Sequence, residues 1–519
     1  MTMAIDSKHP DYSEFIEDWE QLRDTYRGER IVKARGTRYL PMTSGMIADG
    51  GEVSADSAGA KAYRSYVKRA VFPEVVGEAV EAMLGVLHFK PPSIELPAKL
   101  EPMRERATLR GESLEMLLRR INQEQLITGR AGLLLDVPKN APRAELPHVA
   151  LYKAEHLINW DDGDEESGSP DSLNLVVIDE SGNDRRDGFE WERVERFRVL
   201  VLGDLMENEQ AGVSSYSCGV FEKEAKFSTD NLIEPMIRGK KMERIPFVFV
   251  NTKDIVPEPD DAPLIGLSNL ALAIYRGEAD YRQARFMQGQ DTLVTIGATG
   301  GDGEGETRVG AGSELALPMG GDAKFIGVNS QGLPEMRLGL ENDYKRGESK
   351  SQGLIEAVGR AAESGEALRV RVAARTASLN QLALAGAFAL QELLRMAAEW
   401  VGANPEEVIV TPNQDFVSDS IDGRTLVDYM TAKGLGAPVS LQSIHEVMQA
   451  RGLTEKTWEE ELEQLAKEAE EGLPGAVAAG EDDTGSTNPD GPEDDSGMDP
   501  NEDPEAESDD GGEEDADQA

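Results

Sequence analysis

Residues 363–400 read ESGEALRVRVAARTASLNQLALAGAFALQELLRMAAEW and include a long segment, Thr376 to Gln391, without a charged side chain. A helix that is apolar nearly all round must be buried in protein or in lipid. The apolar part is shorter than the ~20 residues that a bilayer requires, and Asn380 and Gln381 lie inside it. We therefore expect residues 375–402 to form the buried spine helix of a large soluble protein. The apolar side chains that predict it are Leu379, Leu382, Ala383, Leu384, Ala385, Phe388, Leu390, Leu393, Leu394, Ala397 and Trp400.

A segment of small residues precedes the spine helix and predicts a loop over residues 363–374. Cations near a helix N-terminus are electrostatically unfavourable, so the arginines that follow this segment suggest an anionic partner. Carboxylates of a second subunit and passing DNA are the two candidates, and ordinary surface charges are the plainer alternative. The residues concerned are Glu363, Ser364, Gly365, Glu366, Arg369, Arg371 and Arg375.

The chain of 519 residues has a formal net charge of −45. From Glu481 onward there are 18 Asp and Glu residues and no Lys or Arg, so we expect residues 472–519 to be a disordered acidic tail. The remaining −27 lies on residues 1–480. Nonspecific DNA binding depends on Lys and Arg that displace counterions, and a body this acidic therefore excludes a conventional DNA-binding protein. It is compatible with a surface past which DNA slides.

The sequence signatures of common enzyme and metal sites are missing. Cys218 is the only cysteine, which excludes an intrachain disulfide and a multi-cysteine zinc site. The glycine-rich segment GATGGDGEGETRVGAG (297–312) lacks the Gly-Lys-Ser/Thr ending of a P-loop, and the acidic run at 161–166 lacks calcium-loop spacing. No HExxH or GxSxG sequence occurs, and the N-terminus has no apolar signal region. We expect a cytosolically made protein that is not an enzyme and holds neither cofactor nor metal.

The first half of the chain combines amphipathic helices with short apolar strands, a pattern typical of an α+β protein. Helices are predicted over 10–28, after Pro73 and from about Ser113, where apolar residues recur at helical spacing. Loop structure is predicted over 43–60, and the polar sequence SGNDRRDG (181–188) is interpreted as a turn between strands. Strands are predicted over 131–138, 148–152, 173–179, 196–203, 216–227 and 245–251.

The character of the sequence changes after a proline-marked linker, residues 256–263. A helix over 265–291 is apolar in its first half and polar in its second, which is typical of a helix held by neighbours in an assembly. A glycine-rich segment, short strands and a weaker helix over 341–362 follow. Gly347, Gly353 and Gly359 weaken that prediction, because each costs a helix interior roughly 1 kcal/mol. We predict a small helical unit over residues 403–471. Its last helix is expected to begin near Thr454.

The serial order of these elements, together with several local sequences, resembles the portal protein family of tailed bacteriophages and prophages. In the N-terminal part the resemblance is carried by RYLPM (38–42), AYRSYVKRAVF (62–72), LITGRAGLLLDVP (126–138) and HLINW (156–160). Further on it is carried by ESGEAL (363–368) and the long helix that follows. The resemblance covers roughly residues 10–470, and the acidic tail lies outside it.

The resemblance implies a portal-type architecture. Its parts would be a mixed α/β wing over 1–262, a first stem helix over 263–291, a small β-containing clip over 292–340 and a second stem helix over 341–362. A tunnel loop over 363–374, the wing's spine helix over 375–402 and a helical crown over 403–471 would follow, with the acidic tail at 472–519. Clip residues implied in partner docking are Asp302, Glu304, Glu306 and Arg308.

The resemblance also implies partners and a location. Portal proteins form a ring, usually of twelve subunits, at one capsid vertex of the virion, through which double-stranded DNA is packaged and ejected. This chain would then be made in the host cytoplasm, and would contact the terminase large subunit, head–tail adaptor proteins, and the major capsid and scaffold proteins. DNA would pass through without sequence-specific binding, and no membrane would be involved.

Two other classes of function remain open from the sequence. One is a non-portal head–tail connector or scaffolding interaction protein that acts as a monomer or small oligomer. The other is a hydrolase with a degenerate site, for which no residue of the sequence offers a candidate. A ring with a channel wide enough for DNA distinguishes the portal interpretation from both.

Overall fold

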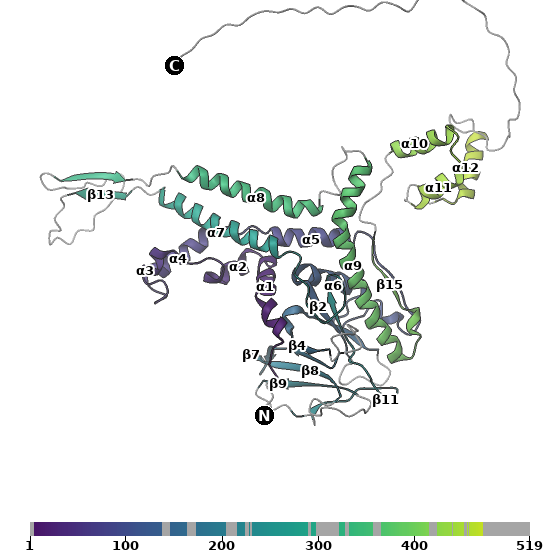
Figure 1. The fold of residues 1–519 in the computed structure, drawn as a ribbon, viewed down its shortest axis with the longest axis horizontal. Helices are drawn as coiled ribbons and strands as arrows, with labels where there is room; N and C mark the ends of the chain where they lie inside the picture. Colours follow the sequence, from purple (N-terminus) through teal and green to yellow (C-terminus); the bar gives the residue numbers. More distant parts are fainter. Residues whose placement is uncertain are drawn as a thin grey trace, which may run out of the picture. The chain divides into compact units, whose positions relative to one another are not determined.

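The structure of the protein is a computed structural model with two compact units, residues 1–418 and 419–519 (Figure 1). It describes residues 5–136, 146–162, 173–203, 215–223, 228, 231–288, 292–296, 321–326, 332–355, 365–414, 423–438, 440–450, 454 and 456–470. Within these ranges no helix is long and apolar enough to cross a membrane. The predicted acidic tail lies outside the described residues.

Helices form most of the N-terminal part of the first unit. They are α1 (Pro10–Tyr26), α2 (Glu29–Ala34), α3 (Ser44–Ala48), α4 (Ala58–Arg69), α5 (Val75–Leu87) and α6 (Leu114–Thr128), with 3₁₀ turns at Gly36–Arg38, Glu101–Met103, Ala154–His156 and Pro405–Glu407. The predictions at α1, α5 and α6 are confirmed. Ser113 caps α6 by accepting a hydrogen bond from the Met116 amide at 3.2 Å, because its hydroxyl satisfies one of the free N–H groups of the first turn. The loop expected over 43–60 is wrong in part, since α3 and the start of α4 lie there.

Two antiparallel sheets lie beside these helices. One has the strand order β12-β2-β3, and the other has the order β4-β5-β8-β9. Their strands are β2 (Arg130–Asp136), β3 (His148–Lys153), β4 (Leu157–Asp161), β5 (Leu175–Asp179), β8 (Arg196–Leu202), β9 (Tyr216–Glu222) and β12 (Phe247–Asn251). Apart from β4, each coincides with a predicted strand. The mixed content of helices and antiparallel strands confirms the α+β class.

Three short strand pairs were not predicted. They are β6 (Gly182–Arg185) with β7 (Trp191–Val194), β10 (Met236–Ile237) with β11 (Lys240–Lys241), and β1 (Ser93–Glu95) with β15 (Ile409–Thr411). The interpretation of SGNDRRDG as a turn is therefore wrong over β6. Strands of two to four residues are too short to show the alternation of apolar residues by which strands are recognised, and β6, β7 and β11 also have no buried residue. The β1–β15 pair also places residues 409–411 with the first unit, although the crown was expected to begin at 403.

A pair of long helices with a hairpin between them follows the sheets in the sequence. Helix α7 (Ile265–Gln288) leads to the antiparallel strands β13 (Thr292–Ile296) and β14 (Asp322–Ile326), and the chain returns through α8 (Leu333–Ile355). Figure 1 shows α7 and α8 side by side. Helix α8 begins eight residues before the expected start at 341. Pro334 lies in the first turn of α8, where a proline is tolerated because its missing N–H would have no partner there.

The spine helix is α9 (Gly365–Val401), and its burial is confirmed over most of its described length. Leu379, Leu382 and Ala383 belong to one apolar core with α4, α5 and α7, whereas the part from Ala387 to Ala398 belongs to a second core with α6, β2 and β12. Because α9 passes from one core to the other, it needs apolar side chains on several faces.

The tunnel loop expected over 363–374 is wrong from Gly365 onward, because α9 begins at that residue. Most of the residues from Glu366 to Arg375 are good helix formers, and neither glycine nor proline occurs among them. Arg369, Arg371 and Arg375 therefore lie on helical backbone rather than in a loop or at a helix start.

The second unit contains α10 (Gly423–Gly434), α11 (Leu441–Ala450) and α12 (Trp458–Glu470). Helix α12 begins four residues after the expected start near Thr454. Its N-terminus is a capping box: the Thr457 amide donates to a Glu460 carboxylate oxygen at 2.9 Å, and the Glu460 amide donates to the Thr457 hydroxyl at 3.4 Å. His445 of α11 packs edge-on against Trp458, with ring centroids 5.4 Å apart.

Candidate assembly site on the paired helices

For most of the site residues predicted from the sequence, the structure describes either no position or only the backbone. Glu363, Ser364 and the clip residues Asp302, Glu304, Glu306 and Arg308 lie outside the described residues. Gly365, Glu366, Arg369, Arg371 and Arg375 are on the helical backbone of α9, and their side chains are not described. Their proposed contacts with DNA or with another subunit therefore stay predictions. The features that the structure does describe around this region are the paired helices and the spine.

The first half of α7 is held against the N-terminal helices by polar contacts as well as by its apolar side chains. The Ser268 hydroxyl is fully buried and lies 3.0 Å from the Thr25 hydroxyl of α1. Arg276 donates from Nε to the Tyr39 carbonyl oxygen at 2.9 Å. Further along, the Tyr66 hydroxyl donates to the Asp280 carboxylate. These contacts fix the direction in which α7 leaves the body.

Two glycines determine how closely α7 and α8 approach each other. Gly277 of α7 faces Leu340, where an added Cβ would lie 2.9 Å from a leucine methyl carbon. Gly347 of α8 faces Ile274 of α7, and a Cβ added at Gly347 would lie 3.8 Å from Ile274 Cδ1. Each helix thus presents a glycine where its partner presents a large apolar side chain, which is the complementarity that close helix packing requires. Gly347, which weakened the sequence prediction of this helix, therefore has a packing role.

A buried carboxylate lies in the same seam. Glu278 of α7 pairs with Arg282 one turn later at 2.5 Å, and the Tyr344 hydroxyl of α8 donates to it at 3.3 Å. Burial, with the negative charge of Glu278 beside it, raises the pKa of Tyr344 to about 12. The tyrosine therefore stays protonated and keeps donating its hydrogen bond throughout the physiological pH range.

We expect Gly347→Ala to stabilise the protein. Its Cβ would meet Ile274, Leu270 and Val75 at ordinary contact distances of 3.8–4.0 Å, and the change removes the helix penalty of about 1 kcal/mol that glycine carries. The thermal unfolding midpoint should rise by a few degrees. Gly277→Ala is the matched control, because its Cβ would press on Leu340 and most of the gain should disappear. A lower midpoint for Gly347→Ala would contradict this packing.

Four large apolar side chains of the pair are exposed near the hairpin. Among residues 333–350, whose exposure the structure describes, Gly347 alone is buried. Phe286 and Met287 near the end of α7 are 42% and 47% exposed, and Met336 and Leu338 near the start of α8 are 37% and 52% exposed. Arg69 covers one face of the Phe286 ring at 4.1 Å. We call these four residues the stem patch. The polar second half of α7 predicted neighbours in an assembly, but the exposed apolar residues of α8 were not anticipated.

The spine helix carries a second exposed pair. Leu384 and Phe388, one helical turn apart, are 42% and 48% exposed, and Gln381 lies on the same side. The expectation that apolar residues all round this helix would be buried is wrong at these two positions. The periodicity of the sequence could not reveal this, since exposed and buried apolar residues have the same hydropathy.

Buried polar groups occur elsewhere in the first unit, but they hold the fold together. Arg23 of α1 pairs with Glu124 of α6 and with Glu155, and Gln125 of α6 donates to backbone carbonyl oxygens of β12 and α9. Among the described residues, no group of three or more His, Cys, Asp or Glu side chains is arranged to hold a metal ion. Nothing in these clusters arranges a nucleophile and a base for catalysis.

Comparisons with known proteins add the following. A protein-family model described as "Domain of unknown function (DUF4055)" matches residues 263–401, the segment from the start of α7 to the end of α9. No curated protein matches the sequence.

Solved structures similar to this chain include chains of gene transfer agent (GTA) particles. One comes from the neck of an empty GTA particle computed with C6 symmetry, with 13% identity, a TM-score of 0.34, and coverage of 73% of this chain and 90% of the other. Another comes from the virion of a native GTA particle, with 14% identity, a TM-score of 0.33, and coverage of 72% and 89%. A third comes from the neck of a native GTA particle computed with C12 symmetry, with 13% identity, a TM-score of 0.33, and coverage of 73% and 89%. Identities and TM-scores this low do not transfer a role to this chain.

Proposed function

We propose that this protein is a ring-forming portal of a tailed-phage-like particle, located at one capsid vertex. In this role it is a structural protein and not an enzyme. The ring, of about twelve subunits, is the conduit through which double-stranded DNA is packaged and ejected, and it is the platform on which terminase and head–tail adaptor proteins dock. The sequence resemblance supports this proposal, and the acidic body suits a channel that DNA passes without adhering.

The observation that carries the proposal is the stem patch. Four large apolar side chains are exposed within short distances in sequence of the hairpin that joins α7 and α8, and exposed apolar surface is a common mark of a protein interface. Here they lie on two antiparallel helices of 24 and 23 residues, of which α8 has little contact with the body beyond α7 and α5. Neighbouring copies arranged around an axis would cover these residues, as the polar second half of α7 already led us to expect from the sequence.

The test is the native mass and the negative-stain image of the purified protein, alone and with its capsid and scaffold proteins. The wild type should form a ring with a central hole. The double variant Met287→Glu/Leu338→Glu should not, because burying two carboxylates in an apolar interface is strongly unfavourable. We expect at least a tenfold loss of ring at equal protein concentration, with the thermal unfolding of the monomer unchanged.

Leu109→Glu is the matched control, since Leu109 is 71% exposed but lies far from the paired helices in sequence and outside both of them. This variant should assemble normally. A stem-patch variant that still forms complete rings would show that the subunit contacts lie elsewhere. A wild type that stays monomeric with capsid and scaffold proteins present would instead support a head–tail connector or scaffolding protein.

A further inference from the structure

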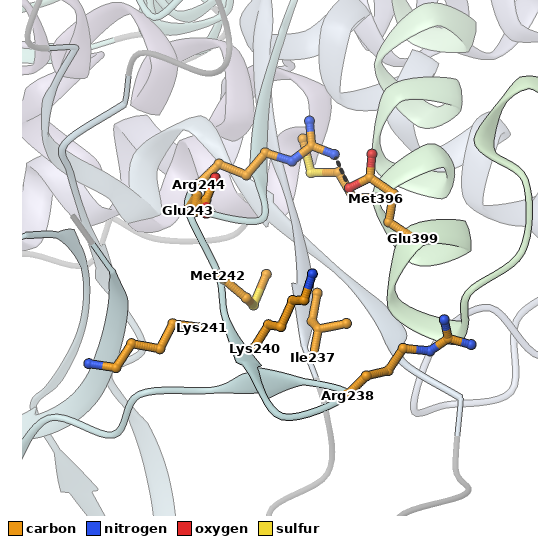
Figure 2. Close-up of a pocket in the computed structure, with 9 residues that line it drawn as sticks. All are labelled: Ile237, Arg238, Lys240, Lys241, Met242, Glu243, Arg244, Met396 and Glu399. Carbon is orange, nitrogen blue, oxygen red and sulfur yellow. Dashed lines mark hydrogen bonds and ion pairs between the residues drawn. The ribbon is translucent and has the colours of Figure 1, made fainter. Parts of the chain in front are cut away.

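A basic pocket lies near the C-terminal end of the spine helix α9. It has a volume of about 570 Å³ and is formed by the β10–β11 hairpin, the residues after it and the last turns of α9 (Figure 2). The hairpin is short because Arg238 and Gly239 both adopt positive φ angles, 53° and 82°, which is the geometry of a tight two-residue turn. The lining residues are Ile237, Arg238, Lys240, Lys241, Met242, Glu243, Arg244, Met396 and Glu399.

Two of the cations in this pocket are used to hold α9. Arg238 donates from Nη2 to the Val401 carbonyl oxygen at 3.1 Å, and its guanidinium lies beside Gly402, whose φ of +64° favours glycine. Arg244 pairs with Glu399 at 2.6 Å, the interaction drawn as a dashed line in Figure 2. A cation beside the last carbonyl groups of a helix is favourable because it opposes the negative end of the helix dipole. These contacts connect the pocket to the end of the spine.

The other two cations are available to a ligand. Lys240 is exposed and forms no ion pair with any residue that the structure describes. Lys241 extends away from the other lining side chains in Figure 2 and pairs with Glu234 at 2.8 Å, but both side chains are well exposed, at 54% and 39%, so this surface pair is readily exchanged for one with a ligand at the rim. Behind these lysines lie two buried methionines, Met242 and Met396. The pocket thus combines a rim of net positive charge, in which Glu243 and Glu399 lie beside four cations, with a floor of two methionines.

We infer that this pocket is a docking site for an acidic peptide segment of a partner protein, with one apolar side chain of that segment resting on the methionine floor. Lys240 and Lys241 would pair with its carboxylates. Methionine floors accept apolar side chains of varied shape. The site is independent of the ring contacts proposed above.

Two arguments favour an acidic peptide over DNA. First, duplex DNA carries one charge per ~1.7 Å of its axis, so the acidic body around the pocket repels a duplex far more strongly than a peptide with a few carboxylates. Second, phosphate groups have no use for an apolar floor, whereas a leucine or a methionine of a peptide does.

The experiment uses the full-length protein and a fluorescein-labelled synthetic peptide of about 16 residues, made of Glu and Asp with one central Leu. Fluorescence anisotropy measures binding at low salt. We expect saturable binding that weakens at least tenfold in Lys240→Glu/Lys241→Glu and is unchanged in the control Lys61→Glu, an exposed lysine of α4. A second peptide, with Ser in place of the Leu, should bind severalfold more weakly. Circular dichroism of each variant confirms that its fold is intact.

The inference is overturned if the leucine peptide does not bind, or if it binds the Lys240→Glu/Lys241→Glu variant as tightly as the Lys61→Glu control. Equal binding of the serine peptide also overturns it, because the apolar floor would then have no part. Tighter binding of a 20-base-pair duplex than of the peptide, with the same sensitivity to the two lysines, would replace the peptide by nucleic acid as the occupant.

Discussion

Replacing Gly386 by leucine should lower the stability of the first unit by about 4 kcal/mol, a cost comparable to the whole stability of many domains. Gly386 lies in the middle of α9, directly over two buried amide side chains of α6. A Cβ at this position would be 2.6 Å from Asn122 Nδ2 and 2.7 Å from Gln125 Oε1. Real Cβ atoms essentially never lie this close to another atom, so both amides, or the helix itself, would have to move.

The amides cannot move freely because they belong to a hydrogen-bonded chain. Asn122 donates to Gln125 Oε1 at 2.9 Å and lies 2.9 Å from His88 Nε2. Gln125 in turn donates to the carbonyl oxygens of Asn251 at 2.6 Å and Leu382 at 3.2 Å. Overpacking a core costs about 1–3 kcal/mol, and each buried polar group that loses its partner costs about as much again. The expected loss of about 4 kcal/mol in stability is the sum of the overpacking cost and the cost of the lost hydrogen bonds.

The matched control is Gly85→Leu, in α5. Gly85 is also a helical glycine, but a Cβ there would meet no atom within 4 Å. Because leucine is a better helix former than glycine, this variant should be neutral or slightly more stable. Thermal unfolding and soluble yield of the two variants separate the outcomes. If both variants behaved alike, the packing of α9 on α6 would not be as described.

Removing the charge of Arg23 should be the second most damaging change. Its guanidinium reaches Glu124 at 2.5 Å and Glu155 at 2.7 Å, and the three side chains are only 10%, 10% and 15% exposed. These contacts join α1, α6 and the turn before β4. Arg23→Met would leave two buried carboxylates without the guanidinium that pairs with them, at a cost of about 3–5 kcal/mol near pH 7.

The loss of stability caused by Arg23→Met should become smaller as the pH falls. Burial by itself would raise the pKa of Glu155, but the hydrogen bond and the positive charge of Arg23 lower it below the usual value of 4.5. A lowered pKa in the folded state means that this stabilisation is fully present above about pH 4.5 and is lost as the pH falls through the folded-state pKa. In Arg23→Met the Glu155 carboxylate loses the hydrogen bond and the positive charge that lower its pKa, and it takes up a proton more readily. The deficit relative to wild type should therefore be largest near neutral pH and shrink below about pH 4.

Urea unfolding of both proteins between pH 3.5 and 7.5 measures this convergence. Arg186→Met is the control, because Arg186 pairs with Glu192 at 3.3 Å while 70% and 56% of the two side chains are exposed. A surface pair of this kind contributes about 1 kcal/mol or less. The double variant Arg23→Met/Glu155→Gln should recover part of the loss at pH 7. A deficit that stayed constant across the pH range would refute the electrostatic explanation.

Local sequence patterns were sufficient to predict the α+β class and many of the elements. The helical spacing of apolar residues located α1, α5, α6 and α7, and runs of apolar residues located the central strands. Such patterns work because the side chains of one element must turn toward a core at the period of that element. The elements that were missed, such as β6 and β10, are short and exposed, so no core imposes a period on them.

The candidate site required the tertiary structure. Hydropathy indicated that α9 is apolar, but whether Leu384 and Phe388 are buried depends on which neighbours reach that face. Glycines in α8 counted against the helix when it was considered alone, yet Gly347 lies where Ile274 of another element needs room. Likewise, Lys240 and Met396 are more than 150 positions apart, and only folding brings them to one pocket. The sequence by itself determined the local conformations, because they depend on nearby residues. Burial, close approach and charge pairing were decided by the tertiary structure, because each depends on residues distant in the chain.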